Sequence, residues 1–251
     1  MTAPALRPLT TGEVLDVSFG LYRGFFLPLV TVTVVTRLVP TVLSVFVVAE
    51  GGMLANPGLS VIHVGISIVL GTLGVAATNF IVSGAYLGHE ISAETALRRA
   101  VRLIGPLILL SLMSWVVIFV GFLLLIVPGV ILLGGLLLAT PVLVLEQPIT
   151  ATDAMSRSWE LTRGFRGKAL LTFLIVGLLL FVPLMLVGVL AVLATMAGIS
   201  SHLATAVLAG LLQIFVYPFG YVVFTVLYYD LRVRKEGFDL ELLAGAAPAE
   251  T

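Results

Sequence analysis

The sequence predicts an all-α integral membrane protein with six transmembrane helices, arranged as three repeats of an amphipathic helix followed by a transmembrane hairpin. Three observations predict this fold: long apolar stretches, the placement of the basic residues, and a short segment that recurs. Of the 251 residues, 60% are apolar and only 10% are charged, and the mean hydropathy is +1.20. Soluble domains carry about 25% charged residues, so this composition indicates a bilayer environment.

Six apolar stretches are candidates for membrane-spanning helices, each of which needs about 20 mostly apolar residues. The stretch 130–145 is short, since at about 1.5 Å per residue it covers about 24 Å of a hydrocarbon core that is ~30 Å thick. It is therefore either a short span or half of a re-entrant hairpin that turns at Pro128 and Gly129. The charge pattern favours a span. We expect spans at 25–49, 61–87, 103–127, 130–145, 169–194 and 203–229.

The basic residues set the expected orientation. All except Arg37 fall in the N-terminal segment, in 88–102, in 146–168 or in the C-terminal segment, and the remaining connections contain no Lys or Arg. Cytoplasmic loops carry the Lys and Arg excess. Six spans place the four basic segments on one side, so both termini are expected in the cytoplasm. The Ala-, Val-, Leu- and Gly-rich composition, with more Arg than Lys, indicates a GC-rich bacterial genome, and the expected location is the bacterial cytoplasmic (inner) membrane.

A segment near the N-terminus recurs 140 positions later. Residues 10–24 and 150–164 are identical at Thr10/Thr150, Ser18/Ser158, Leu21/Leu161, Arg23/Arg163 and Gly24/Gly164, and 92–105 fits the same frame more loosely. Each copy is predicted to be an amphipathic helix with a Ser or Thr N-cap. These helices are expected at about 10–24, 90–102 and 149–164.

The third copy carries charges at helical spacing. Asp153, Arg157 and Glu160 share one face, and Asp153 with Arg157 is expected to form a local ion pair worth about 0.2–0.5 kcal/mol. Such a helix suits the headgroup layer or the inner mouth of the bundle. We expect the basic segments to contact lipids, chiefly anionic ones, or a protein partner. The residues expected to make these contacts are Arg98, Arg99, Arg102, Arg157, Trp159, Arg163, Arg166, Lys168, Arg232, Arg234 and Lys235.

The predicted spans contain Arg37, Asn79 and Gln213, whose strongly polar side chains are costly in a membrane and often functional. Arg37 either belongs to a substrate or ion pathway, or it extends outward to the interface or pairs with Glu50. The second interpretation is favoured. Asn79 and Gln213 are expected to form hydrogen bonds between helices.

No catalytic or cofactor motif is present. The chain has no cysteine, no His-Glu-x-x-His metal motif, no phosphate-binding loop and no Gly-x-Ser-x-Gly elbow. We therefore expect no enzyme activity, no cofactor and no metal, and the net charge of +0 gives no reason to expect a nucleic-acid partner. Glu146 is expected to cap or ion-pair with the basic helix that follows it.

Several segments resemble the membrane domain of bacterial glycerophosphoryl diester phosphodiesterases: LRPLTTGEVLDVSFGLYRGFFLPL, VPGV, PVLVLE, AMSRSWELTRG and LYYDLRVRKEGFDLELL. The resemblance extends along nearly the whole chain. It implies six helices and a membrane role, but not hydrolysis, because the catalytic barrel of two-domain members does not appear before Thr251. The positions that fit the family pattern are Pro128, Gly129, Glu146, Ala154, Ser158, Trp159, Arg163, Tyr229, Asp230, Arg232 and Glu236.

The sequence therefore predicts one membrane domain, 1–243, and a disordered tail, 244–251. The expected function is that of a non-enzymatic inner-membrane protein that interacts with lipids or a partner in envelope or lipid physiology, with self-association left open. The alternative is a small transporter or channel that uses Arg37 and helices broken by proline.

Overall fold

The computed structural model describes residues 7–198, 202–238 and 240, and within these ranges the chain forms helices and no strands. The predicted all-α class is confirmed. The tail 244–251 lies outside the described residues. The helices are α1 (Thr11–Gly24), α2 (Phe26–Ala49), α3 (Pro57–Tyr86), α4 (Ala93–Arg102), α5 (Ile104–Leu124), α6 (Ile126–Leu136), α7 (Ala139–Leu145), α8 (Ala151–Thr162), α9 (Arg166–Met196) and α10 (His202–Glu236).

Six helical stretches are long and apolar enough to cross a membrane, as the sequence predicts. The fold is therefore compatible with a multi-pass integral membrane protein. The repeat relation and the side on which the termini lie stay predictions. The six stretches are Phe26–Ala49, Pro57–Tyr86, Ile104–Leu124, Ile126–Leu145, Arg166–Met196 and Ala204–Glu236.

The three predicted amphipathic helices are present as α1, α4 and α8, and each begins at the expected cap. Thr10 and Glu13 form a reciprocal capping box at the start of α1. Ser92 accepts a hydrogen bond from the Thr95 amide at α4, and Thr150 accepts one from the Asp153 amide at α8. These bonds satisfy amides that a helix leaves without partners in its first turn, so each helix begins at a defined residue.

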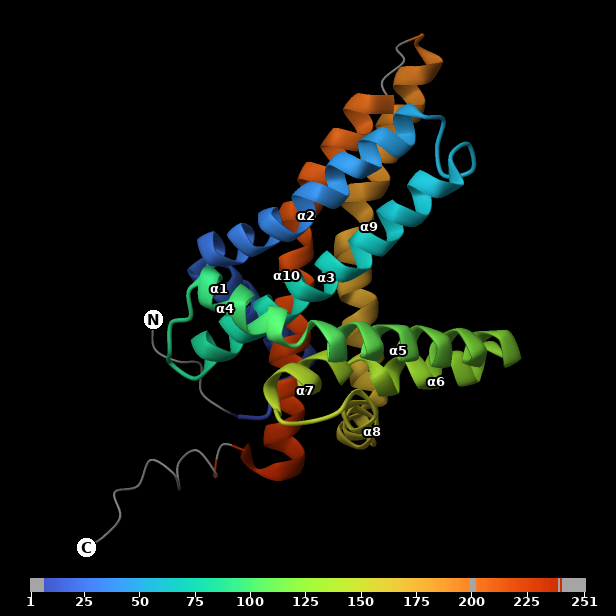
Figure 1. The fold of residues 1–251 in the computed structure, drawn as a ribbon. Coiled ribbons are helices and arrows are strands. Elements are labelled where there is room, and N and C mark those ends of the chain that lie inside the picture. The colour runs from blue at the N-terminus through green and yellow to red at the C-terminus, as the bar shows by residue number, and fades with distance from the viewer. Residues whose placement is uncertain (1–6, 199–201, 239, 241–251) are drawn as a thin grey trace, which may run out of the picture.

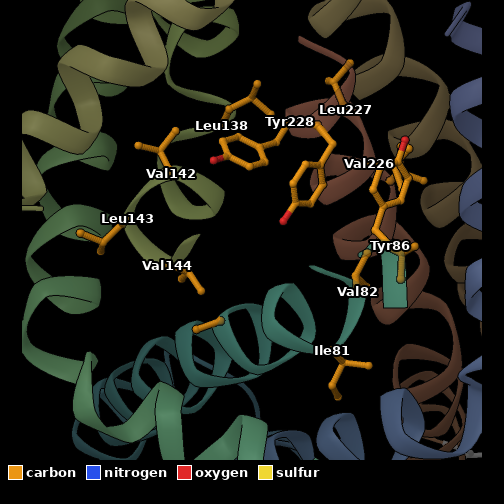
Figure 2. Packing of buried hydrophobic residues seen from close by; sticks show 14 of the residues in the cluster. Ile81, Val82, Tyr86, Leu138, Val142, Leu143, Val144, Val226, Leu227 and Tyr228 are labelled. Carbon is orange, nitrogen blue, oxygen red and sulfur yellow. The ribbon is translucent and has the colours of Figure 1, made fainter. Parts of the chain in front are cut away.

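Helix α10 is the centre of the molecule and packs against α1, α2, α3 and α9 (Figure 1). Helices α1, α4, α7, α8 and the last turns of α10 gather at one end, which we call the polar end. The connection 50–56 between α2 and α3 lies at the other, distal, end. Figure 2 shows core side chains of α3, α7 and α10 converging near the polar end, among them Tyr86, Val142 and Tyr228.

The fourth predicted span is not one continuous helix. Helix α6 ends at Leu136 and α7 begins at Ala139. The expected turn at Pro128 and Gly129 is also wrong, because α5 and α6 are joined by Leu125 alone. A proline is tolerated in the first turn of a helix, where its missing N–H removes no helical hydrogen bond, so Pro128 lies inside α6.

The α5–α6 hairpin leaves the bundle sideways. In Figure 1 it runs across α9 from a base at the polar end, and its tip lies apart from the distal ends of the other long helices. Its base contacts α8 and its arms contact each other.

Candidate functional site

The last turns of α10 carry charged side chains on two faces. Tyr228, Arg232 and Glu236 follow one another at intervals of four and share one face, while Asp230 and Arg234 share another. Both sets lie at the polar end, where they meet side chains of other elements. We call the two sets, with their partners, the Asp230 cluster and the Glu236 cluster.

The Asp230 cluster joins the N-terminal segment to α9 and α10. The Asp230 side chain is 0% exposed. Its Oδ1 accepts hydrogen bonds from the Leu9 amide (2.6 Å) and from Arg234 Nε (3.0 Å), and its Oδ2 pairs with the Lys168 ammonium. The Leu9 carbonyl accepts a hydrogen bond from Lys168 at 2.6 Å and another from Arg234. A buried carboxylate is stable only with such partners, and here two cations and an amide supply them.

The Glu236 cluster joins α8 to α10 and to the end of α7. Arg157 Nε lies 2.9 Å from Glu146 Oε2, and Arg157 Nη2 lies 2.5 Å from Glu236 Oε1. Arg232 Nε is 3.0 Å from Glu236 Oε2, and the Tyr228 hydroxyl donates to Glu146 at 2.9 Å. The predicted ion pair between Glu146 and the following helix is confirmed.

The predicted Asp153–Arg157 ion pair is wrong. Asp153 instead accepts a hydrogen bond from the Thr150 hydroxyl at 2.5 Å, at the exposed start of α8. Desolvation lowers the pKa of Arg157, but hydrogen bonds and charge from Glu146 and Glu236 outweigh it and leave the pKa raised. Two carboxylates in a half-buried site attract the guanidinium more strongly than one exposed carboxylate on the same helix does.

Trp159 is packed between α6 and α9. The indole lies against the backbone of Gly135, which has no side chain. A Cβ added at Gly135 would lie 2.2 Å from Trp159 Cε3. The Arg166 guanidinium covers the ring, with Cζ 3.6 Å from the centroid. The Gly135 carbonyl also accepts hydrogen bonds from Ser158 (2.8 Å) and Thr162 (3.3 Å). These contacts fasten α8 to α6.

The residues predicted to contact headgroups therefore fall into two groups. Arg157, Lys168, Arg232 and Arg234 make internal ion pairs, Trp159 and Arg166 pack on each other, and the Lys235 ammonium donates to the carbonyls of Glu160 and Arg163. The second group is exposed and consists of Arg98, Arg99, Arg102 and Arg163.

Helix α4 carries three members of this second group, Arg98, Arg99 and Arg102. Its Ala96 and Ala100 are 0% exposed and face the bundle. Arg98 pairs with Glu94 at 2.7 Å, in a bridge whose two side chains are 77% and 74% exposed. Arg99 Cζ lies 5.9 Å from the Phe80 ring centroid. Within the described chain, neither Arg99 nor Arg102 has an ion-pair partner.

Arg37 lies midway along α2 and contacts α10. Its Nη2 donates to the Tyr221 hydroxyl at 2.8 Å, and its Cζ lies 4.9 Å from the Tyr217 ring centroid. Arg37 thus contacts aromatic side chains rather than Glu50, and its guanidinium is not ion-paired within the part of the chain that the structure describes.

The two other polar residues predicted to be important within the spans, Asn79 and Gln213, lie on α3 and α10. Asn79 Oδ1 accepts a hydrogen bond from Thr225 at 2.7 Å, which joins α3 to α10, while Asn79 Nδ2 is buried without a partner among the described residues. Gln213 is half-buried on α10, one turn before Tyr217.

Sequence reasoning from periodicity missed Tyr228 and Asp230. The signal that could have found them is the spacing of four between Tyr228, Arg232 and Glu236 and between Asp230 and Arg234, which places each set on one helix face.

Among residues 7–198, 202–238 and 240, no three His, Asp or Glu side chains gather as a metal ion would require. In comparisons with known proteins, no family model, curated protein or solved structure matches this chain.

Proposed function

We propose that this chain is a non-enzymatic integral membrane protein of a bacterial inner membrane, with both termini in the cytoplasm, and that its polar end binds anionic lipid headgroups. The observation that carries the proposal is the exposure of Arg99 and Arg102 on α4, without ion-pair partners in the described chain. The placement of the basic segments and the resemblance to the membrane domain of glycerophosphoryl diester phosphodiesterases support the same role.

The geometry of α4 suits a headgroup layer. Ala96 and Ala100 pack on the bundle, so the arginine face is turned away from it. A guanidinium can bind a phosphate through two parallel hydrogen bonds, which an ammonium cannot do. Each basic residue near an anionic surface contributes about 1 kcal/mol. Arg157, Lys168 and Arg234 already neutralise internal carboxylates, so we assign them a structural role.

Replacement of Arg99 and Arg102 by Gln tests the proposal. The full-length protein is placed in nanodiscs of mixed phosphatidylglycerol and phosphatidylcholine, and retained lipids are identified by native mass spectrometry. The loss of two charges should lower the preference for phosphatidylglycerol by about 2 kcal/mol, or roughly 30-fold. The matched control is Arg99→Lys with Arg102→Lys, which keeps the charge and should keep most of the preference. An unchanged preference in the Gln variant would refute headgroup binding by α4.

A second candidate function is transport of a small anion, and it is favoured by Arg37. Arg37 lies midway along α2 and contacts Tyr217 and Tyr221. It has no carboxylate partner among the described residues, so its positive charge is uncompensated there. Anion flux into proteoliposomes should then depend on Arg37 and fall in Arg37→Ala. Absence of flux from the wild-type protein across inorganic and carboxylate anions would reject this candidate.

A further inference from the structure

The turn of the α5–α6 hairpin contains no polar side chain. Between Ser114 and Thr140 every residue is aliphatic, aromatic, glycine or proline. Leu125 alone connects the two helices. The distal connection between α2 and α3 differs, because it contains Glu50 and Asn56. Connections that reach water normally carry polar residues of this kind.

The hairpin tip is also the most continuously exposed apolar segment of the described chain. Leu123, Leu124, Leu125, Ile126 and Val127 are 73%, 70%, 69%, 74% and 67% exposed. Five successive large apolar side chains in contact with water would oppose the hydrophobic effect, whereas acyl chains would solvate all of them.

Both backbone groups of the connecting residue, Leu125, are paired within the protein. The Leu125 amide donates to the Gly121 carbonyl at 3.1 Å, and the Leu125 carbonyl accepts from the Gly129 amide at 3.3 Å. Pro128 has no N–H to satisfy. Polar backbone groups inside a bilayer must be paired within the protein, and the turn residue meets that condition.

The two arms form one unit, anchored at the polar end. A Cβ added at Gly121 would lie 3.1 Å from the Gly129 Cα, so the arms are in close contact near the tip. At the base, Gly135 is held by Ser158, Thr162 and Trp159 of α8. From this base the hairpin runs sideways, and its tip does not approach the distal ends of the other long helices (Figure 1).

We propose that α5–α6 is a re-entrant hairpin, whose tip Leu123–Val127 ends inside the hydrocarbon core and contacts lipid acyl chains. Both arms then enter and leave on the same side of the membrane. The basic segments before and after the hairpin still lie on one side, as their charge requires. The inference rests on the membrane insertion in the proposed function, but not on headgroup binding by α4.

Because the chain has no cysteine, single cysteines can report the position of the tip. Three leucines give a matched set: Leu125 at the tip, Leu54 in the distal connection (96% exposed) and Leu186 within α9 (59% exposed). Each full-length variant is reconstituted into liposomes and treated with a charged maleimide applied to both sides. We expect Leu54→Cys to be labelled, and Leu125→Cys to be labelled no faster than Leu186→Cys until denaturing detergent is added.

A nitroxide attached to Cys at position 125 supplies the second measurement. A tip surrounded by acyl chains should collide more often with oxygen than with a water-soluble nickel chelate, and a lipid-borne quencher near the bilayer centre should reach it. Labelling of Leu125→Cys at the rate of Leu54→Cys would overturn the re-entrant hairpin. Disulfide-linked dimers through position 125 would overturn acyl chains as the occupant in favour of a second copy.

Two controls keep these outcomes separate. If Leu125→Cys does not fold, Ile126→Cys, at a side chain that is 74% exposed, replaces it. If Leu186→Cys is labelled as fast as Leu54→Cys, the membrane insertion of the chain fails. If Leu125→Cys is labelled as fast as Leu54→Cys while Leu186→Cys is not, insertion stands and the hairpin reaches the aqueous surface.

Discussion

Gly135 has no space for a side chain, because Trp159 lies against its backbone. A Cβ at this position would lie 2.2 Å from Trp159 Cε3 and 2.5 Å from Cζ3, and the Arg166 guanidinium also contacts the ring, with Cζ 3.6 Å from its centroid. We expect Gly135→Ala to displace the indole and to lower the free energy of unfolding by about 1–3 kcal/mol, as overpacked cores do. Thermal unfolding in detergent, followed by circular dichroism, measures the loss.

Gly177→Ala is the matched control. Gly177 lies within α9, and a Cβ there would meet no heavy atom within 4 Å. Ala is the better helix former, so this variant should be as stable as the wild type or slightly more stable. Equal unfolding temperatures for the two variants would show that the Trp159 contact does not constrain Gly135.

Glu13 is held ionised at the start of α1. The Arg7 guanidinium (2.5 Å), followed by the Thr10 amide (2.7 Å) and hydroxyl, lowers the pKa of Glu13 from 4.5 to about 2. The contribution of Glu13 to stability is therefore complete above about pH 4.5 and is lost as the pH falls through about 2. Carbon NMR of the Glu13 carboxyl group should show a midpoint near the lower value. In Arg7→Gln the midpoint should rise towards 4.5, and an unmoved midpoint would exclude Arg7 as the main cause.

The sequence predicts a residue contact well when both partners are local. The Thr10 and Glu13 box follows from spacing alone, and it forms. The partners of Arg157 do not follow from spacing, because Glu236 reaches α8 only after the chain has folded back through α9 and α10. A local pair with Asp153 gains about 0.2–0.5 kcal/mol, and two half-buried carboxylates outweigh it.

At the scale of the elements, Arg157 connects α8 to the ends of α7 and α10. Its loss would remove one ion pair from Glu146 and one from Glu236. We expect Arg157→Gln to lower the free energy of unfolding by about 1–3 kcal/mol. Breaking a fully buried ion pair costs about 3–5 kcal/mol, and the 29% exposure of Arg157 reduces that figure. Chemical unfolding in mixed micelles measures the difference.

Asp153→Asn separates the two possible partners of Arg157. If the local pair mattered, this variant would be destabilised as Arg157→Gln is. Because Asp153, at the exposed helix start, bonds with no other residue than Thr150 in the described part of the chain, we expect a loss of no more than about 0.5 kcal/mol. A larger loss for Asp153→Asn than for Arg157→Gln would contradict the Glu236 cluster.

Helix types and approximate ranges follow from the sequence, but the interior of the apolar run 115–139 does not. Hydropathy shows that the apolar stretch 103–145 is long enough for two crossings, yet residues 115–139 contain no polar side chain to mark where the chain turns. Pro128 and Gly129 are the usual markers of a turn. Here the chain turns at Leu125, where close contact between Gly121 and Gly129 lets the two arms meet.

At the scale of the molecule, composition predicts the number of apolar helices but not their directions. A lipid-facing helix is apolar on every side. Its sequence therefore does not show which face packs on a neighbouring helix or how the helix is tilted. The sideways course of α5–α6 is set instead by the contacts at its base, where Gly135 meets Trp159 and Ser158.

The Asp230 cluster holds parts of the molecule that are distant in the chain. It connects the backbone of Leu9, which precedes α1, to Lys168 at the start of α9 and to Arg234 at the end of α10. Without its carboxylate the N-terminal segment, α9 and α10 have no common anion at the polar end. The stability of the whole bundle should therefore depend on this one side chain.

We expect Asp230→Asn to be the most destabilising of these substitutions. An amide keeps the shape of the side chain but leaves Lys168 and Arg234 without a buried negative charge, and removing one partner of a buried pair costs about 3–5 kcal/mol. Asp16→Asn, at an exposed position on α1, removes the same charge and should change the free energy of unfolding by no more than about 0.5 kcal/mol. Unfolding in detergent measures both, and limited proteolysis should cleave the segment before α1 faster in Asp230→Asn alone. If the two variants have the same free energy of unfolding, the buried ion pairs of Asp230 do not stabilise the polar end.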